Sequence, residues 1–189
     1  MLENVHMSSA NQDLSTRQIR TDLPSFRRWF DGSKVVNEAG APMVVFHGTP
    51  NDFSVFDTFP AYFTCDWDAA MAYACSQYAR EGHDGDPTVM SVYLSMKNPR
   101  VISAAELLTL VGDEVGEIDW TSIDNLAYTL EMQGFDGMIL QGVTDFSGMD
   151  AGQRQTRSYD QYVAFNAQQI KIAVVQKPSY DHEISGLEL

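Results

Sequence analysis

The sequence predicts an α+β domain whose strands pair mainly antiparallel. Short runs of strand-forming residues alternate with helical patterns, and the alternation lacks the regular βαβ spacing of a parallel sheet. The chain has 189 residues, of which 44% are hydrophobic, and this suits one domain with a sizeable core. We expect residues 1–22 to form a flexible N-terminal arm, 23–177 the folded domain and 178–189 a loose C-terminal tail.

The first predicted elements lead to a histidine at the end of a strand. Pro24 opens a short helix whose aromatic residues are spaced to face one side. Strand-forming runs at 34–36 and 42–46 then flank a turn that ends in Gly40, which predicts a hairpin. The second run delivers His47 where the strand should end. Residues 61–64 follow as a short buried strand.

The rest of the chain reads as helices and strands in irregular order. A helix over 66–80 has Asp66 as its predicted N-cap, and a helix over 122–133 should stop at Gly134. Residues 104–111 form another predicted helix, and the polar stretch 144–158 is expected to be a mobile loop. Further strands are expected over 89–96, 135–140, 161–165 and 170–175.

Charge and composition narrow the classes of partner. With 26 acidic and 12 basic residues the net charge is −14, so the surface repels phosphate backbones and we expect no non-specific nucleic-acid binding. A protein with a basic face would be attracted, although such a charge also serves solubility alone. No apolar run approaches the roughly 18 residues of a membrane span, and the N-terminus lacks a secretion signal. These features predict a soluble cytoplasmic protein, of a bacterial or a host cell; delivery without a signal would leave no trace.

Two patterns are candidates for a binding site, and each has an ordinary alternative. His47, followed by Gly48 and Thr49, offers ring nitrogens beside a backbone that a ligand can approach, or it is a satisfied structural histidine. Tyr62 on a strand and Tyr73 on the following helix would border a slot for a flat ring, or they are core tyrosines. Histidines and cysteines are scattered without metal-ligand spacing, so we predict no metal.

A series of motifs, in this order and spacing, resembles the ADP-ribosyltransferase domains embedded in phage and prophage polyvalent proteins. The resemblance runs from about residue 25 to 173. More distantly it extends to the His-Tyr-Glu branch with the diphtheria-type toxins and the poly-ADP-ribose polymerases. The motifs are Trp29-Phe30, Ser33-Lys34-Val35-Val36, Val45-Phe46-His47-Gly48-Thr49, Tyr62-Phe63-Thr64, Ala69-Ala70-Met71-Ala72-Tyr73, Leu94-Ser95-Met96-Lys97-Asn98-Pro99, Gly134-Phe135-Asp136-Gly137, and Gln161-Tyr162-Val163-Ala164-Phe165 with Gln169-Ile170-Lys171.

The resemblance implies a split pair of mainly antiparallel sheets with peripheral helices around a cleft for NAD, which is consumed as a co-substrate. His47 would hydrogen-bond the adenosine-side ribose, and Thr49 would help to anchor it. The Gly48 backbone would hold the nicotinamide carboxamide. Tyr62 and Tyr73 would sandwich the nicotinamide ring. Phe63 and Thr64 would shape that wall.

At Gln161 the chain departs from the family pattern, which has a glutamate there. Cleavage of the nicotinamide–ribose bond builds positive charge on the ribose, which an anion stabilises better than an amide does. Three interpretations stay open: Gln161 orients the ribose in a slower enzyme, another acid supplies the charge, or the domain only binds. The candidate acids are Asp160, Asp145 and Asp150.

The predicted function is therefore mono-ADP-ribosylation of a macromolecule by a phage, prophage or effector protein of toxin type. Extended poly(ADP-ribose) synthesis is disfavoured because chain elongation in the relatives depends on the glutamate that Gln161 replaces here. Tyr159 and Asp160 would help to choose the acceptor, and Arg154 and Arg157 would meet the NAD phosphates or simply face solvent. The alternatives are a non-catalytic acidic binding or inhibitor protein on the same fold, and an NAD glycohydrolase that transfers to water. Neither a nucleophile elbow nor a Gly-rich phosphate loop is present.

Overall fold

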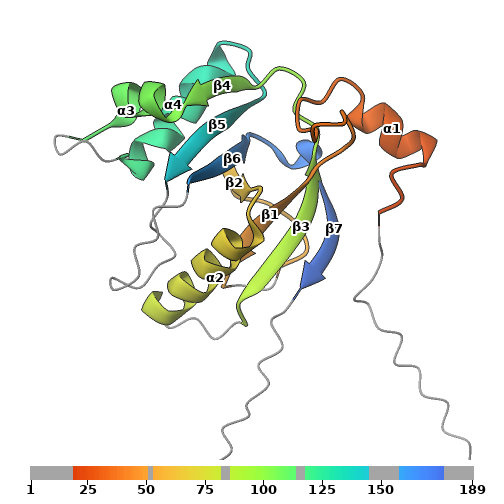
Figure 1. Ribbon diagram of the computed structural model, residues 1–189, viewed down its shortest axis with the longest axis horizontal. Coiled ribbons are helices and arrows are strands. Elements are labelled where there is room, and N and C mark those ends of the chain that lie inside the picture. Colours follow the sequence, from red (N-terminus) through yellow and green to blue (C-terminus); the bar gives the residue numbers. More distant parts are fainter. Residues whose placement is uncertain (1–18, 51–52, 82–85, 114–117, 145–157, 177–189) are drawn as a thin grey trace, which may run out of the picture.

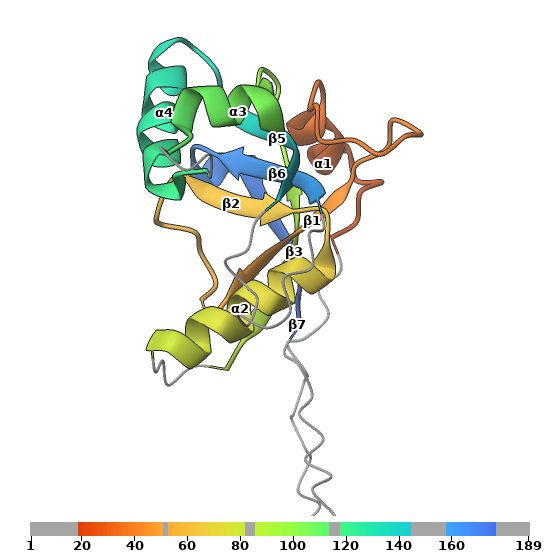
Figure 2. The same ribbon diagram turned by 60° about the vertical axis from the view of Figure 1, so that its left-hand side comes forward.

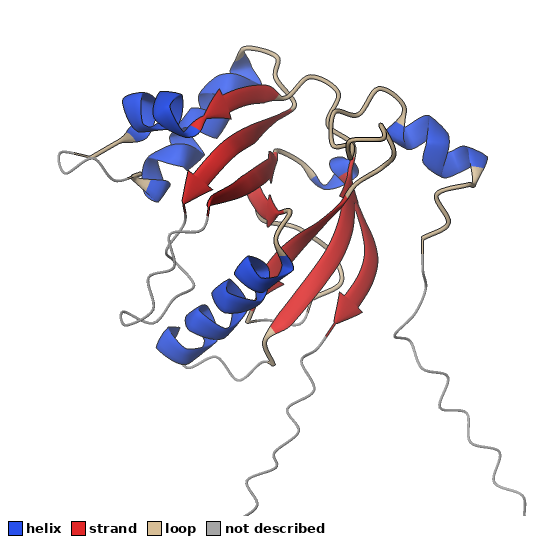
Figure 3. Ribbon diagram, in the orientation of Figure 1, coloured by secondary structure: helices blue, strands red, loops and turns tan. Residues whose placement is uncertain are grey.

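The computed structural model describes residues 19–50, 53–81, 86–113, 118–144 and 158–176. Within them, the chain folds into a strongly twisted sheet with helices at its two ends and across one face (Figures 1 and 3). The helices are α1 (Pro24–Phe30), α2 (Trp67–Glu81), α3 (Ala104–Val111) and α4 (Trp120–Met132), with a 3₁₀ turn η1 (Ala167–Gln169). The strands are β1 (Val44–Thr49), β2 (Ala61–Thr64), β3 (Thr88–Leu94), β4 (Arg100–Ser103), β5 (Gly137–Thr144), β6 (Ser158–Ala164) and β7 (Ile170–Gln176).

The strands lie in the order β4-β5-β6-β2-β1-β3-β7, and every neighbouring pair except β4–β5 is antiparallel. The predicted α+β class with mainly antiparallel pairing is confirmed. The sheet is nearly divided at its centre, since β1 and β2 share one register pair, Phe46 with Thr64, whereas β1 and β3 pair over their whole length. The result is two half-sheets that meet at a narrow seam between β1 and β2.

Helix α2 lies along the half-sheet of β1 and β3, close to the seam (Figures 1 and 2). Its predicted N-cap is confirmed, because the Asp66 carboxylate accepts the Ala69 amide N–H at 3.1 Å. The small residues Ala70 and Ala74 are buried and let the helix approach the strands closely. This close approach also puts Tyr73 of α2 beside the seam.

Helices α3 and α4 cover the opposite end, beside β4 and β5 (Figure 2). Helix α4 begins at Trp120, two residues earlier than expected, because the Asp119 side chain accepts the Thr121 N–H at 3.0 Å. It ends as predicted near Gly134, whose φ of 90° suits glycine. The N-terminal part of α4 reaches β2, where Asp124 accepts a hydrogen bond from the Tyr62 hydroxyl.

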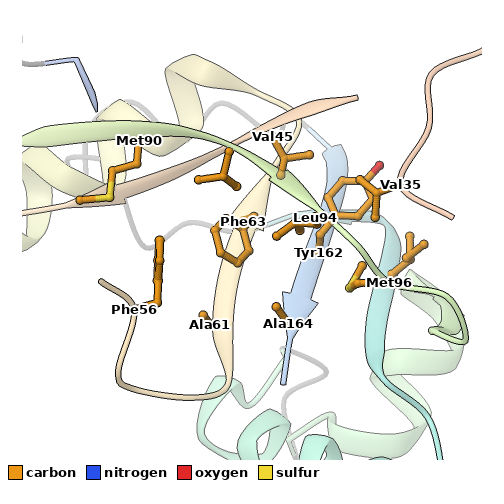
Figure 4. Packing of buried hydrophobic residues seen from close by; sticks show 12 residues of the cluster. Val35, Val45, Phe56, Ala61, Phe63, Met90, Leu94, Met96, Tyr162 and Ala164 are labelled. Atoms are coloured by element: carbon orange, nitrogen blue, oxygen red, sulfur yellow. The ribbon is translucent and has the colours of Figure 1, made fainter. Parts of the chain in front are cut away.

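The alternating side chains of β2 and β6 divide the interior into two cores. On one face, Phe63 and Tyr162 join residues of β1 and β3 such as Val45 and Met90 (Figure 4). On the other face, Val163 packs with the residues of β4, β5, α3 and α4, and Tyr62 lies against that cluster. Tyr62 therefore stands at the margin of the second core, where a side chain can remain accessible.

Two features differ from the expectation. The hairpin expected around Gly40 is reduced to one bridge between Val36 and Pro42, because the Asn37 side chain accepts N–H groups within the turn and replaces ladder bonds. Strand β4 was not predicted: it has four residues at a sheet edge, and its parallel partner β5 lies far along the chain. No helix in the described part of the chain has the length and apolarity needed to cross a membrane.

The predicted arm and tail fall largely outside the described residues, as does the loop expected at 144–158. Their boundaries stay predictions.

Candidate functional site

A pocket of about 460 Å³ opens at the seam, between α2 on one side and α4 on the other. It collects side chains or backbone from β1, β2 and β6 as well as from both helices. The lining residues are Phe46, His47, Gly48, Tyr62, Phe63, Thr64, Ala69, Ala70, Tyr73, Trp120, Thr121, Asp124, Tyr159 and Gln161. The pocket thus joins residues that lie more than a hundred positions apart in sequence.

His47 is held in one orientation by its surroundings. Its Nδ1 lies 2.8 Å from the carbonyl oxygen of Tyr62, and because a carbonyl only accepts, Nδ1 carries the proton and Nε2 is an acceptor. The rings of Phe53, Phe56 and Phe63 lie 5.8, 5.1 and 5.6 Å from the imidazole, centroid to centroid. Burial lowers the pKa of His47, although the bond to Tyr62 opposes that shift. The imidazole is therefore neutral and offers an acceptor nitrogen.

Gly48 is required by the packing of α2. A Cβ atom built there would lie 1.8 Å from the backbone oxygen of Ala70, far inside van der Waals contact. The sequence suggested that a glycine here leaves room for a ligand; the structure shows that the helix backbone fills the side-chain position. The close approach brings Ala69, Ala70 and Tyr73 to the pocket wall beside the Gly48 backbone.

Tyr62 enters the pocket from β2 and is tied to α4. Its hydroxyl donates a hydrogen bond of 2.5 Å to Oδ1 of Asp124. Burial raises the pKa of Tyr62 well above its usual value, and the bond to Asp124, the charge of Asp124 and the nearby Tyr73 raise it further. The hydroxyl therefore stays protonated as a donor. With Tyr73 also in the lining, two aromatic rings border the space in which a flat group could stack.

Gln161 shares the face of Tyr62. It pairs with Thr64 in the β2–β6 register, and Tyr62 lies two positions along from Thr64, so all three side chains lie on one face. Gln161 is 6% exposed and lines the pocket. Its neighbour Asp160 has the opposite orientation, since its Oδ1 accepts the Gly142 amide at 2.9 Å. The fold thus brings Gln161 to the site and leaves Asp160 outside it.

The remaining predicted residues differ in whether they line the pocket. Thr64 lines the pocket, and its hydroxyl accepts the Asp66 amide at 3.0 Å. Phe63 borders the pocket, but its ring packs in the core beside His47. Thr49 is buried at the end of β1 and is not among the lining residues. The ligand contacts expected of these three stay predictions. Four predicted residues lie outside the described part of the chain, namely Asp145, Asp150, Arg154 and Arg157.

Three lining residues on α4 were not predicted: Trp120, Thr121 and Asp124. The spacing of Trp120 and Asp124, four positions apart, is the one local signal, because it puts both on one helix face. The sequence carries no further mark that this face meets β2, since the contact depends on how α4 packs at the sheet end. Tyr159, expected near the acceptor, does line the pocket.

Charge in the pocket is concentrated at one place. Asp124 is the single carboxylate among the described lining residues, while His47 is neutral and Gln161 is an amide. Across the described residues, no three His, Cys, Asp or Glu side chains gather closely enough to hold a metal ion. The arrangement offers aromatic walls, an acceptor imidazole, a buried amide and one negative charge, which suits a flat polar ligand with a hydroxylated sugar.

The family model described as "ADP-Ribosyltransferase in polyvalent proteins" matches residues 37–180, which is more than half of the chain. The matched region contains every described residue that lines the pocket. No curated protein matches the chain.

Proposed function

Since the chain belongs to the ADP-ribosyltransferase family of polyvalent proteins, we propose that it cleaves NAD and transfers a single ADP-ribose to a macromolecule. The observation that carries the proposal is the convergence of His47, Tyr62, Tyr73 and Gln161 on one pocket. These residues come from β1, β2, α2 and β6, and they are the ones that the family resemblance assigns to NAD.

The pocket suits the nicotinamide riboside half of NAD. Its volume of about 460 Å³ lies within the range of roughly 300–1,000 Å³ that is usual for small-molecule sites. Tyr62 and Tyr73 provide aromatic surface for the nicotinamide ring, and the Gly48 backbone lies beside them for its carboxamide. Stacking on each ring contributes about 0.5–1.5 kcal/mol beyond the burial of its area.

His47 has its protonation state fixed for the task proposed. Because Nδ1–H is taken by the Tyr62 carbonyl, Nε2 accepts a hydrogen bond from a ribose hydroxyl. The three phenylalanines around the ring hold it in place before any ligand binds. Such preorganisation lowers the entropic cost of binding a sugar in one orientation.

Gln161 holds the ribose next to the bond that breaks. NAD supplies a nicotinamide–ribose bond whose cleavage places positive charge on the ribose. The buried amide of Gln161 orients a ribose hydroxyl there. As a neutral group, it stabilises the positive charge only weakly, and it cannot act as a general base that takes a proton from the attacking group of the target. We therefore propose slow transfer of one ADP-ribose to an acceptor that is already nucleophilic, and no chain elongation.

The acceptor is proposed to be a macromolecule of a host cell, modified by a phage, prophage or effector protein in the cytoplasm. The net charge of −14 favours a protein with a basic face over a nucleic acid. Tyr159, at the rim formed by β6, is proposed to contact this acceptor.

A second candidate follows from the amide at position 161. A pocket that binds NAD without a carboxylate at this position fits a domain that binds and does not turn over, or that transfers slowly to water as an NAD glycohydrolase. The acidic surface would then serve a binding or inhibitory role.

Release of nicotinamide from NAD by the purified protein, with and without cell lysate, separates these functions. Transfer predicts release that depends on lysate, together with label from NAD on a macromolecule. Release without lysate indicates hydrolysis or self-modification, and no release at high protein concentration favours the binding function. Tyr62→Ala should abolish release, while Tyr128→Ala, at an exposed tyrosine of α4, serves as the matched control.

A further inference from the structure

The hydrogen bond between Tyr62 and Asp124 joins the aromatic wall of the pocket to the single carboxylate among the described lining residues. The Tyr62 hydroxyl lies 2.5 Å from Oδ1 of Asp124, and both residues line the pocket. The hydroxyl is the distal end of the tyrosine side chain, so the carboxylate stands at the edge of the surface on which a flat ring would stack. This position differs from that of Gln161, which enters from β6 on the sheet side.

Nothing else in the described lining competes with this charge. Burial keeps His47 neutral, Gln161 is an amide, and Lys and Arg are absent from the described lining residues. A cationic ring stacked on Tyr62 would lie close to this carboxylate and be attracted to it. Because Asp124 is exposed, salt would screen the attraction. A neutral ring of the same size would gain the stacking but not the attraction.

We propose that Asp124 is a specificity-determining residue that selects the positively charged, oxidised nicotinamide ring over the neutral, reduced one. The proposal rests on the proposed use of NAD by this pocket. Asp124 has two parts to its role: its Oδ1 positions the Tyr62 ring, and its charge distinguishes the redox state of the dinucleotide. The chain would thereby take NAD⁺ from a cellular mixture that also contains NADH.

The test is the affinity of the full chain for NAD⁺, NADH and ADP-ribose, measured by calorimetry on the wild type and on Asp124→Asn, Asp124→Glu and Glu131→Gln. Asp124→Asn should lower the affinity for NAD⁺ by about fivefold, as expected for an exposed charge pair, and leave those for NADH and ADP-ribose within about twofold. Asp124→Glu keeps the charge and should keep the preference. Glu131→Gln removes an equal charge from an exposed position of α4 and should change nothing.

The outcomes separate this inference from the function on which it rests. If the wild type binds neither NAD⁺ nor ADP-ribose, both the proposed use of NAD and the selectivity role of Asp124 are contradicted. If it binds NAD⁺ and Asp124→Asn keeps the full preference over NADH, the selectivity role is overturned and the use of NAD stands. Unchanged ADP-ribose affinity shows that Asp124→Asn is folded. If that variant does not fold, the salt dependence of the wild-type preference decides, since a preference that is constant from low to high salt contradicts a charge origin.

In turnover, the same substitution should raise KM for NAD more than it lowers kcat. The carboxylate attracts the ring in the bound substrate, and this attraction is not specific to the transition state. A loss confined to kcat would contradict the assigned role.

Discussion

The two sides of the pocket are built in different ways. On the β1 side, His47 is enclosed by phenylalanines and Gly48 lies against the backbone of α2. On the side of β6 and α4, an amide at 161 and a carboxylate at 124 reach the pocket, beside the aromatic residues Trp120 and Tyr159. The first side depends on close packing, so one added atom forces neighbouring groups to move. The second side depends on charge and hydrogen bonding, and a residue there can change without moving the backbone. Gln161, the residue expected to depart from the family pattern, lies on the second side.

The largest effect is expected on the packed side, from His47→Ala. The substitution removes the acceptor nitrogen, the bond to Tyr62 and the ring that three phenylalanines enclose. We expect nicotinamide release to fall by at least about a hundredfold, in the range known for loss of a positioned polar group. Steady-state kinetics measures this. A variant that keeps its full rate would show that His47 is only a structural histidine.

Gly48→Ala tests the packed side without removing any polar group. The added Cβ meets the Ala70 carbonyl, so α2 and β1 must separate, and we expect a loss of about 1–3 kcal/mol in the free energy of unfolding. Affinity for NAD should fall as well, because Tyr73 moves with α2. Urea unfolding gives the first quantity and calorimetry the second. Unchanged values in both would show that this close approach does not constrain the site.

A smaller effect, of opposite sign, is expected on the polar side from Gln161→Glu. If the charge on the ribose limits the rate, a carboxylate at this position should raise turnover by about tenfold, since an anion stabilises developing positive charge better than an amide. Gln168→Glu, on the exposed turn η1, is the matched control. No gain, or a loss, would mean that the charge is supplied elsewhere, and Asp124 would be the first residue to examine.

The smallest effect concerns pH. Burial lowers the pKa of His47 below its usual value near 6.5, so in this region the unfolded chain binds a proton that the folded chain does not. Stability from this group is complete above about pH 6.5 and declines as pH falls toward the folded pKa, by at most about 1.4 kcal/mol per pH unit. Urea unfolding at pH 7.5, 6.5 and 5.5 measures the slope, and His47→Gln should flatten it. An equal slope in that variant would assign the proton to another group.

The packed side was largely predictable from sequence, and the polar side was not. Short-range signals were enough for α2, whose Asp66 cap and small residues at 70 and 74 are as expected. They also predicted the strand that carries His47, although β1 continues to Thr49, two residues beyond the expected end, because these residues pair with β3. Gln161 was found because its motif is contiguous. Asp124 was missed because its role depends on the packing of α4 against the sheet, and β4 because its parallel partner lies far away in sequence. Apart from the four-residue spacing of Trp120 and Asp124, the local sequence carries no signal of these long-range contacts.

A dinucleotide bound across the seam between β1 and β2 should measurably raise the stability of the folded protein. One register pair joins the half-sheets there, while the pocket above spans Gly48 on one side and Tyr62 on the other. A dinucleotide that contacts both residues would link the two half-sheets where a single register pair joins them. By mass action, a ligand present at a hundred times its Kd adds about 2.7 kcal/mol to the free energy of unfolding. A melting curve would therefore register bound nucleotide even in a variant that performs no chemistry.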